Sequence, residues 1–479
     1  MRVLLIQPSH TFDGGSRAPE CIPLGLTYIG KVLQNGGHEV EILDIWLHQY
    51  NREQTIEKIK KLDYDMVGIS ALSTQYSYVR WLSDTLKKYN NGPIFLGGAL
   101  PTFSAEVVLK NTKVDICIIG EGEVTIKEMM DNIGKLDNVE GIFFKEGNEI
   151  FKNPSRPPIK NLDEVEFPAW DLIDVEKYIT LNSIGNKRKM QVVSGRGCPY
   201  NCRFCSKTFK GYRCRSVKNI IDEIKTLIDR YGINHIDFLD ELVVISKKRI
   251  FELCDAIEPL NIQWSCQGRV NLVNYEILKR MKKANCVSVG YGVESGSQKI
   301  LDNMNKQIRV KQSKEAIINT LNLGMTTAVQ MMYGYPGETL ETLDETVHFF
   351  DDLPYTGVAF LSPTTPIPGS PLYDECLKNG MIKDEVKYLE SLSAGYLALY
   401  TKAVMKNTIN FTSFSDEDYW RLKKDAEWRI FKHQFRRFPF YFLRRYWLKT
   451  IKYYKRWGIK KLFHRVYMAL KRFASGRPA

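Results

Sequence analysis

Three cysteines lie close together in the middle of the chain, in the segment GRGCPYNCRFCS. Cys198, Cys202 and Cys205 have the spacing C-x3-C-x2-C, so one short loop carries three thiolates. Thiolates are the ligands of iron–sulfur clusters, and three of them can bind three irons of a four-iron cubane. The run has no fourth Cys, which leaves one iron open for a substrate. An open metal position is typical of a catalytic rather than a structural site.

Two other interpretations of this triplet compete with a cluster. The first is three unrelated thiols, but a chain with this cysteine content is expected to contain only roughly 0.004 triplets of this spacing by chance. Zinc prefers four protein ligands in paired C-x2-C or Cys/His groups. Cys214 would be the fourth ligand, but Lys207, Lys210 and Arg213 lie between it and the triplet. The spacing therefore favours the cluster.

The cysteine loop resembles the C-x3-C-x-aromatic-C signature of the radical S-adenosylmethionine superfamily, with Phe204 as the aromatic residue. The similarity extends from Val192 to about Ile382. It implies a [4Fe–4S] cluster whose open iron binds the amino and carboxylate groups of S-adenosylmethionine. Transfer of an electron then breaks a C–S bond and gives a 5′-deoxyadenosyl radical. The resemblance also implies a reducing electron donor of the flavodoxin or ferredoxin type.

Further segments resemble the cofactor-binding strands of that superfamily. FLDE places Asp240 and Glu241 near the methionine amino group, although the family more often has Gly-Gly-Glu there. Arg269 is a candidate partner for a carboxylate. The alternative is that the glycines of these segments serve only turns and close packing. GYGVESGS resembles the segment near the ribose and the methionine carboxylate and GYPGET the turn near the adenine, which assigns cofactor contacts to Glu294, Ser295, Gly334, Pro336 and Gly337.

The first ~150 residues alternate short apolar runs with helical patterns, which is typical of a Rossmann-like, doubly wound parallel sheet. Ligands of such sheets bind beyond the carboxyl ends of the strands. Small and polar residues gather at those ends. The predicted strands begin at Val3, Val40, Asp65, Pro93 and Asp115, and the residues expected at the ligand site are Ser70, Gly97, Gly98, Gly120 and Gly122.

This N-terminal region resembles the cobalamin-binding domains of cobalamin-dependent radical S-adenosylmethionine enzymes. The match rests on IPLGLTYIGKVLQNGGHEVEILD, ISALS, GGALPT and GEGE, and through GEGE it adds Glu121 and Glu123 to the expected cofactor contacts. It implies a bound corrinoid, because glycines allow close backbone approach. The Asp-x-His-x-x-Gly motif of the cobalamin mutases is absent, and His10 is expected at the surface or the pocket edge. The lower face of the cobalt is then not ligated by histidine. The alternative is a domain that kept the fold and lost the cofactor.

A second alternating series begins at MQVVSGRGC and contains six βα units in about 200 residues, which predicts a partial (β/α)6 TIM-like barrel. The chain is thus expected to be an α/β protein with a helical C-terminal tail. The expected domains are a cobalamin-binding-like domain at 1–150, a linker at 151–185, the barrel at 186–400 and the tail at 401–479.

The net charge of +13 is concentrated in the tail. From Trp428 onward the chain has 16 Lys and Arg and no Asp or Glu, with 15 aromatic residues up to Phe473. Three interpretations compete: a helical segment packed on the barrel, an interfacial membrane segment, and binding of nucleic acid. The density of aromatic residues favours the membrane surface and disfavours nucleic acid.

The sequence predicts a radical enzyme that transfers a methyl group from methylcobalamin to an unactivated carbon of a small-molecule, apolar or lipid-like substrate. Cyclisation, oxidation or rearrangement without methyl transfer is the first alternative. A non-catalytic iron–sulfur or zinc protein that binds RNA or membrane through its tail is the second. No secretory signal or spanning segment is evident, so the predicted location is the cytoplasm, with peripheral contact at the inner membrane surface.

Overall fold

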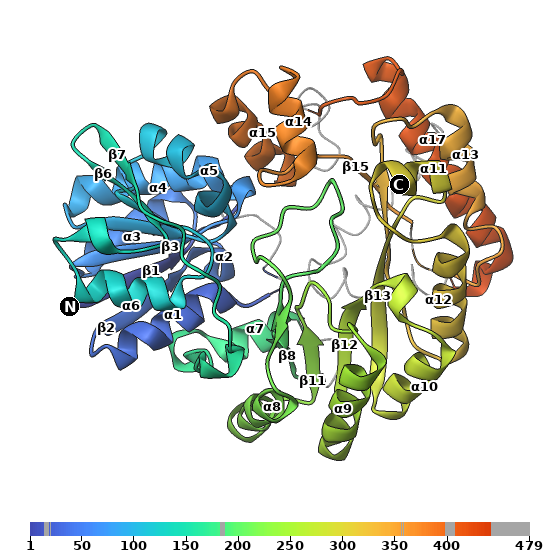
Figure 1. Ribbon diagram of the computed structural model, residues 1–479, viewed down its shortest axis with the longest axis horizontal. Coiled ribbons are helices and arrows are strands. Elements are labelled where there is room, and N and C mark those ends of the chain that lie inside the picture. Colours follow the sequence, from blue (N-terminus) through green and yellow to red (C-terminus); the bar gives the residue numbers. More distant parts are fainter. Residues whose placement is uncertain are drawn as a thin grey trace, which may run out of the picture. The chain divides into compact units, whose positions relative to one another are not determined.

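Seven strands form the first sheet of the computed structural model, which describes residues 1–13, 19, 21–182, 187–355, 357, 359–397 and 408–441 (Figure 1). The strand order is β2-β1-β3-β4-β5-β6-β7. The first five strands pair in parallel and confirm the prediction. They are β1 (Arg2–Gln7), β2 (Glu39–Asp44), β3 (Met66–Ser70), β4 (Ile94–Gly97) and β5 (Ile116–Ile118).

An antiparallel hairpin that the sequence analysis missed completes this sheet. It consists of β6 (Ile142–Glu146) and β7 (Glu149–Lys152), and β6 pairs with β5. The hairpin carries the sheet past residue 150, where the first domain was expected to end.

Helices cover both faces of the first sheet because successive side chains of a buried parallel strand point to opposite sides. Val3 and Leu5 of β1 belong to one apolar cluster, and Leu4 and Ile6 belong to another. The first cluster includes residues of α1 (Leu24–Asn35) and α6 (Glu123–Asp131). The second includes residues of α3 (Arg52–Lys61), α4 (Tyr76–Tyr89) and α5 (Ala99–Asn111), whereas α2 (Ile45–His48) is a single turn after β2.

The described part of the expected linker packs on α1. Trp170 is buried, and the amide of Ala169 donates to the carbonyl oxygen of Thr27 at 3.0 Å. A Cβ at Gly30 would lie 2.6 Å from Leu172, so α1 can approach the linker this closely only with glycine there. The linker ends in α7 (Val175–Asn182).

Six strands form the second sheet, in the order β15-β14-β13-β12-β11-β8, and two short strands, β9 (Gly195–Arg196) and β10 (Arg213–Cys214), form a separate antiparallel ribbon. All six strands were predicted, and their order along the sheet follows the chain, as in an incomplete barrel. They are β8 (Lys189–Val192), β11 (His235–Phe238), β12 (Gln263–Gly268), β13 (Cys286–Glu294), β14 (Val329–Tyr333) and β15 (Leu361–Pro363). The connecting helices are α8 (Val217–Tyr231), α9 (Lys247–Ile257), α10 (Tyr275–Lys283), α11 (Gln298–Asn303), α12 (Val310–Asn322) and α13 (Leu340–His348).

The chain divides into two compact units, and the division passes through the second sheet. The first unit contains Met1–Gln267, Lys283–Cys286 and Thr365–Ile409. The second contains Gly268–Lys282, Val287–Thr364 and the C-terminal residues from Asn410. The cysteine loop and the whole first sheet therefore belong to one unit.

Residues after the last strand return to the first unit, which the sequence analysis did not foresee. This segment contains α14 (Pro371–Lys378) and α15 (Glu385–Leu397). Leu389 and Leu392 of α15 join the apolar cluster of α4 and α5. Arg80 of α4 pairs with Glu390 at 2.8 Å.

The helical C-terminal region begins with α17 (Asp416–Arg437), which covers the outer strand of the second unit. Glu427 accepts a hydrogen bond of 3.0 Å from the amide of Leu361 on β15. Lys423 is buried, pairs with Glu427 at 2.7 Å and lies over the ring of Phe360. An edge strand exposes unpaired backbone groups. Here Glu427 of α17 provides the hydrogen-bond acceptor for one of them, the amide of Leu361. Most of the basic aromatic tail, residues 442–479, lies outside the described residues. None of the described helices has the length and apolar character needed to cross a bilayer.

Candidate functional site

The cysteine loop leaves the second sheet after β8 and is closed at its base by the β9–β10 ribbon. The ribbon pairs Arg196 with Arg213 and Gly195 with Cys214. Gly197 has a φ of +84°, and a Cβ there would overlap the carbonyl oxygen of Gly211. Only glycine fits this position, because it accepts the left-handed conformation and leaves room for the opposite strand. The two ends of the loop are therefore held in contact.

The three cysteines differ in exposure along this loop. Cys202 is buried, Cys198 is half-buried and Cys205 is exposed. The amide of Cys205 donates to the carbonyl oxygen of Cys202 at 3.2 Å, which forms a turn between them. Arg203 fixes the outer side of the loop, because its carbonyl oxygen accepts from the amide of Leu372 and its guanidinium pairs with Glu375 at 2.6 Å. Phe204, between Arg203 and Cys205, is half-buried.

The donor set of this loop fits an iron–sulfur cluster. Cys198, Cys202 and Cys205 supply three thiolates from one short loop, and each thiolate of a cubane binds a different iron. Within the described residues, no three His, Cys, Asp or Glu side chains form a group that could hold a single ion. The three cysteines would hold a [4Fe–4S] cluster and leave its fourth iron without a protein ligand from this loop.

Asp240 and Glu241 follow β11 and have different surroundings. Asp240 is buried and accepts hydrogen bonds from the amide of Ser194 at 2.9 Å and from its hydroxyl at 2.8 Å. Burial raises the pKa of Asp240 to about 6. Its carboxyl thus fixes the backbone that leads from β8 into the cysteine loop. Glu241 is exposed and remains the candidate for a direct contact with the methionine amino group.

In the second unit, Glu294 ends β13 in a strained conformation, with a φ of +68°. Its carboxylate pairs with the ammonium of Lys306 at 2.8 Å, and both side chains are buried. Arg269 donates to the carbonyl oxygen of Lys306. The two predicted residues, Glu294 and Arg269, therefore form one cluster with Lys306, which was not predicted. The neighbouring Ser295 is also buried and hydrogen-bonds Thr346 of α13 at 3.1 Å. Sequence reasoning missed Lys306 because it lies outside any recognisable motif.

The GYPGET turn follows β14 in the same unit. Gly334 and Gly337 have φ values of +75° and +91°, which explains glycine at both positions. The carbonyl oxygen of Pro336 accepts a hydrogen bond from Asn303 at 3.1 Å. Glu338 is buried, and its carboxylate accepts from the amide of Gly334. Burial raises the pKa of Glu338 to about 7.

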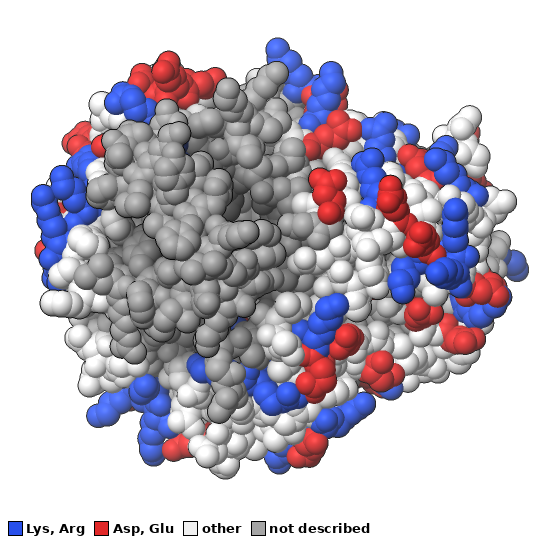
Figure 2. All heavy atoms as spheres, turned by 180° about the vertical axis from the view of Figure 1, so that it is seen from behind, with Lys and Arg blue, Asp and Glu red and all other residues white. Residues whose placement is uncertain are grey.

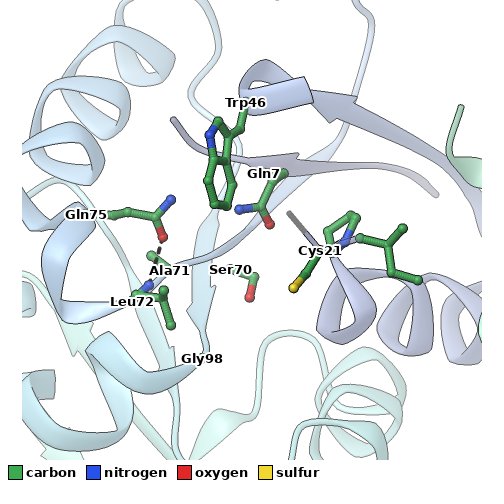
Figure 3. Close-up of a pocket in the computed structure, with 10 residues that line it drawn as sticks. Gln7, Cys21, Trp46, Ser70, Ala71, Leu72, Gln75 and Gly98 are labelled. Atoms are coloured by element: carbon green, nitrogen blue, oxygen red, sulfur yellow. Dashed lines mark hydrogen bonds between the residues drawn. The ribbon is translucent and has the colours of Figure 1, made fainter. Parts of the chain in front are cut away.

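A cavity of about 170 Å³ lies at the carboxyl ends of β1, β3 and β4 in the first unit (Figure 3). Ser70 and Gly98 line it, as the sequence analysis expected for the ligand site. The space beside Gly97 and Gly120 is open, because a Cβ at either would have no heavy atom within 4 Å. Side chains that the sequence analysis did not single out complete the wall, among them Gln7, Cys21, Trp46 and Gln75.

Three predicted neighbours of this cavity have other surroundings. His10 is not at the surface but buried, and its ring lies edge-on to Trp46 at 4.8 Å between centroids. Burial lowers the pKa of His10 to about 4, so its imidazole is neutral at pH 7. Glu121 and Glu123 pair with arginines of the β9–β10 ribbon instead of facing an open space. Gly122 between them allows the close approach of Ile29, since a Cβ at this glycine would lie only 2.9 Å from that side chain.

Comparison with known proteins agrees with both halves of this site. Residues 11–130 match the family model of the B12 binding domain, and residues 192–350 match that of the radical SAM superfamily. An uncharacterized methyltransferase of Pyrococcus horikoshii is 33% identical over 397 residues, which cover 80% of this chain and 84% of the relative. The anaerobic magnesium-protoporphyrin IX monomethyl ester cyclase of Rubrivivax gelatinosus is 30% identical, with 81% and 72% covered.

Two solved structures have the same fold at low sequence identity. The radical S-adenosylmethionine methyltransferase TsrM of Kitasatospora setae, bound to cobalamin and a [4Fe–4S] cluster, has a TM-score of 0.65 at 17% identity, with 79% of this chain and 78% of that chain covered. The cobalamin-dependent radical enzyme OxsB, bound to aqua-cobalamin and S-adenosylmethionine, has a TM-score of 0.66 at 17% identity, with 99% and 75% covered.

The fold and the cysteine loop together define a radical S-adenosylmethionine enzyme with a B12-binding domain. The chain belongs to this family, whose members include methyltransferases and cyclases. Its cofactors are a [4Fe–4S] cluster, S-adenosylmethionine and cobalamin.

The raised pKa of Glu338 gives a pH-dependent contribution to stability. The ordinary value is 4.5 and the folded value is about 7, so between these the folded protein binds a proton that the unfolded chain does not bind. Stability from this group is therefore lost as the pH rises through about 7. We expect Glu338→Gln to become more stable relative to the parent as the pH rises from about 5 to about 8. Urea unfolding at several pH values measures this, with exposed Glu341→Gln as the control. A stability difference that does not change with pH would contradict it.

Proposed function

We propose that the enzyme transfers a methyl group from cobalamin to an unactivated carbon of its substrate. When bound, the cluster and S-adenosylmethionine supply the radical that removes hydrogen, and cobalamin supplies the methyl group. The observation that carries this proposal is that one compact unit contains both the three-cysteine loop and the B12-binding sheet. The methyltransferase relative of Pyrococcus horikoshii supports the same outcome.

Cyclisation is the second candidate outcome. The relative from Rubrivivax gelatinosus is a cyclase and matches this chain over 81% of its length. Both outcomes need the same radical, so the cysteine loop and the S-adenosylmethionine contacts serve either one. In methyl transfer, a second molecule of S-adenosylmethionine would supply the methyl group that cobalamin then passes to the substrate, so the two outcomes differ in whether that methyl group appears in the product. Deuterium in that methyl group would therefore appear in a methylated product and be absent from a cyclised one.

We assign the contacts with S-adenosylmethionine from the surroundings of the predicted residues. Glu241 is exposed in the segment after β11, so its carboxylate can accept a hydrogen bond from the methionine ammonium. Glu294 is already neutralised by Lys306, and this pair would present a fixed dipole rather than a free charge. Asp240 acts through Ser194, by holding the start of the loop.

The cluster assignment predicts a clear effect of Cys202→Ala. Removing one of three thiolates leaves an iron without its protein ligand, so we expect loss of the cluster and of 5′-deoxyadenosine formation. Iron content and 5′-deoxyadenosine are measured on anaerobically reconstituted and reduced protein. Cys214→Ala is the matched control, because Cys214 is exposed at the base of the same loop. Parental product from Cys202→Ala would refute the cluster, and zinc lost from both variants would support the mononuclear alternative.

The B12-binding assignment predicts that Gly97→Leu blocks the corrinoid. Gly97 ends β4 beside the cavity, and a Cβ there meets no other heavy atom within 4 Å. The Gly97→Leu variant should therefore fold normally, and its leucine side chain should project into the space that the corrinoid needs. Corrinoid retained on gel filtration, read from its absorption, should fall by at least about tenfold, as when a site's supporting contacts are lost. Iron content and melting temperature should match the parent. Full retention by a folded variant would place the corrinoid elsewhere.

We also propose that the basic aromatic tail contacts an anionic membrane surface and that the substrate is lipid-like. The described side chains on the face shown in Figure 2 mix positive and negative charges, in keeping with the 52 basic and 55 acidic residues before Trp428. The positive excess is thus confined to the tail, where aromatic rings alternate with Lys and Arg. Such segments bind the headgroup region of anionic bilayers. The enzyme would then work at the inner face of the membrane.

Sedimentation with lipid vesicles tests this proposal. The full chain should bind vesicles that contain an anionic lipid, bind neutral vesicles more weakly, and lose affinity at high salt because charges are screened. The same chain with Lys and Arg beyond residue 442 changed to Gln should bind neither. Equal binding by this variant and the parent would contradict a role for the tail. Binding to RNA but not to either vesicle would favour the nucleic-acid interpretation.

A further inference from the structure

Four charged side chains form a buried cluster in the first unit. Arg196 and Arg213 come from the β9–β10 ribbon, and Glu121 and Glu123 come from the segment between β5 and α6. The side chains of Arg196 and Glu121 are 9% and 8% exposed, and those of Glu123 and Arg213 are 11% and 16% exposed. The cluster contains two positive and two negative groups, so its net charge is zero.

Arg196 bridges both carboxylates. Its guanidinium lies 3.0 Å from Glu121 and 2.5 Å from Glu123. This fork geometry requires arginine, because lysine presents a single point charge. The Arg196 guanidinium also lies over the rings of Tyr28 and Phe209, at 5.6 Å and 5.4 Å from their centroids. Burial alone would lower the pKa of Arg196, but the charges of Glu123 and Glu121 outweigh it, and the pKa is raised.

Glu121 is the centre of the cluster. Both of its oxygens lie 2.9 Å from the guanidinium of Arg213, and one of them accepts a hydrogen bond of 2.7 Å from the amide of Ile159. Arg213 also donates to the carbonyl oxygen of Ile159 at 2.6 Å. The carboxylate of Glu121 therefore ties together three segments that are far apart in the sequence: the loop after β5, the linker and the ribbon.

The cluster joins the two cofactor regions of the chain. Arg196 lies two residues before Cys198, and Arg213 is its partner across the base of the cysteine loop. Glu121 and Glu123 lie beside Gly120 and Gly122, at the edge of the B12-binding sheet. Buried ion pairs cost desolvation energy, and breaking one by removing a single partner leaves a buried charge uncompensated. Moving the β9–β10 ribbon away from the segment after β5 would separate these ion pairs and leave buried charges uncompensated. The ion pairs therefore hold the two segments in a fixed position relative to each other.

We propose that Glu121, Glu123, Arg196 and Arg213 are positioning residues that fix the base of the cysteine loop to the B12-binding domain and set the charge beside the cluster. The proposal rests on the cluster assignment and is independent of whether the product is methylated or cyclised. The two glutamates neutralise the two arginines next to the cysteine loop. Net charge near an iron–sulfur cluster is one of the factors that set its reduction potential.

Two variants of the full-length, reconstituted enzyme separate the charge effect from the positioning effect. Glu123→Gln removes one negative charge and leaves Arg196 partly unneutralised, so the midpoint potential of the cluster should shift to a more positive value. Arg196→Lys keeps the charge but cannot bridge two carboxylates, so the potential should change less while the loop is held more weakly. In both variants iron should be lost to a chelator about 10-fold faster than in the parent. Potentials come from redox titration followed by electron paramagnetic resonance.

Glu128→Gln is the matched control. Glu128 lies on α6, five residues after Glu123, and pairs with Arg156 of the linker but not with the ribbon. It should show the potential and the iron-loss rate of the parent. Parental potential and iron retention in folded Glu123→Gln and Arg196→Lys would overturn the proposal. Should Glu123→Gln fail to fold, Arg196→Lys decides, because it preserves the charge. A folded Arg196→Lys with parental iron retention would overturn it, and so would an equal effect in Glu128→Gln.

Discussion

The closure of the cysteine loop is the constraint on which the rest of the site depends. Three thiolates can serve one cluster only if the short segment that carries them has a fixed shape. Gly197 makes this closure sterically feasible, because its backbone lies against Gly211 where no side chain would fit. Asp240 fixes the entry to the loop through Ser194, and the β9–β10 ribbon pairs its two ends. The loop's geometry thus comes from the paired ribbon, the close approach at Gly197 and the side chains around the loop, rather than from the cysteines themselves.

Several charged or polar side chains buried near the predicted cofactor sites are paired with protein partners. Glu121 and Glu123 pair with arginines, Glu294 pairs with Lys306, and Ser295 pairs with Thr346. A buried charge without a partner would be strongly destabilising, so pairs of this kind are expected at buried positions. They also mean that a residue in a cofactor motif can act by holding backbone in place. The resemblance assigned Glu121, Glu123, Glu294 and Ser295 to motif segments but did not reveal these partners.

The reaction class follows from the combination of two sites, neither of which would define it alone. A parallel sheet with glycines at its strand ends can bind many cofactors, and a cysteine loop can serve many radical reactions. The first unit contains both, together with a segment from beyond the barrel strands that packs against α4 and α5. Linkage of the two sites within one unit is what methyl transfer between their cofactors would require.

The sequence by itself determined the eleven parallel strands, the helices α1, α4 and α8, and the cysteine loop, because hydrophobic periodicity and residue spacing are local properties. It did not reveal the β6–β7 hairpin, the return of α15 to the first sheet, or the role of Lys306. It offered the surface or the pocket edge for His10, which is buried against Trp46 of the cavity wall. Only the tertiary structure decided these points, since each depends on a partner that is remote in sequence. Glu121 and Arg196 are 75 residues apart, and no local pattern records that pairing.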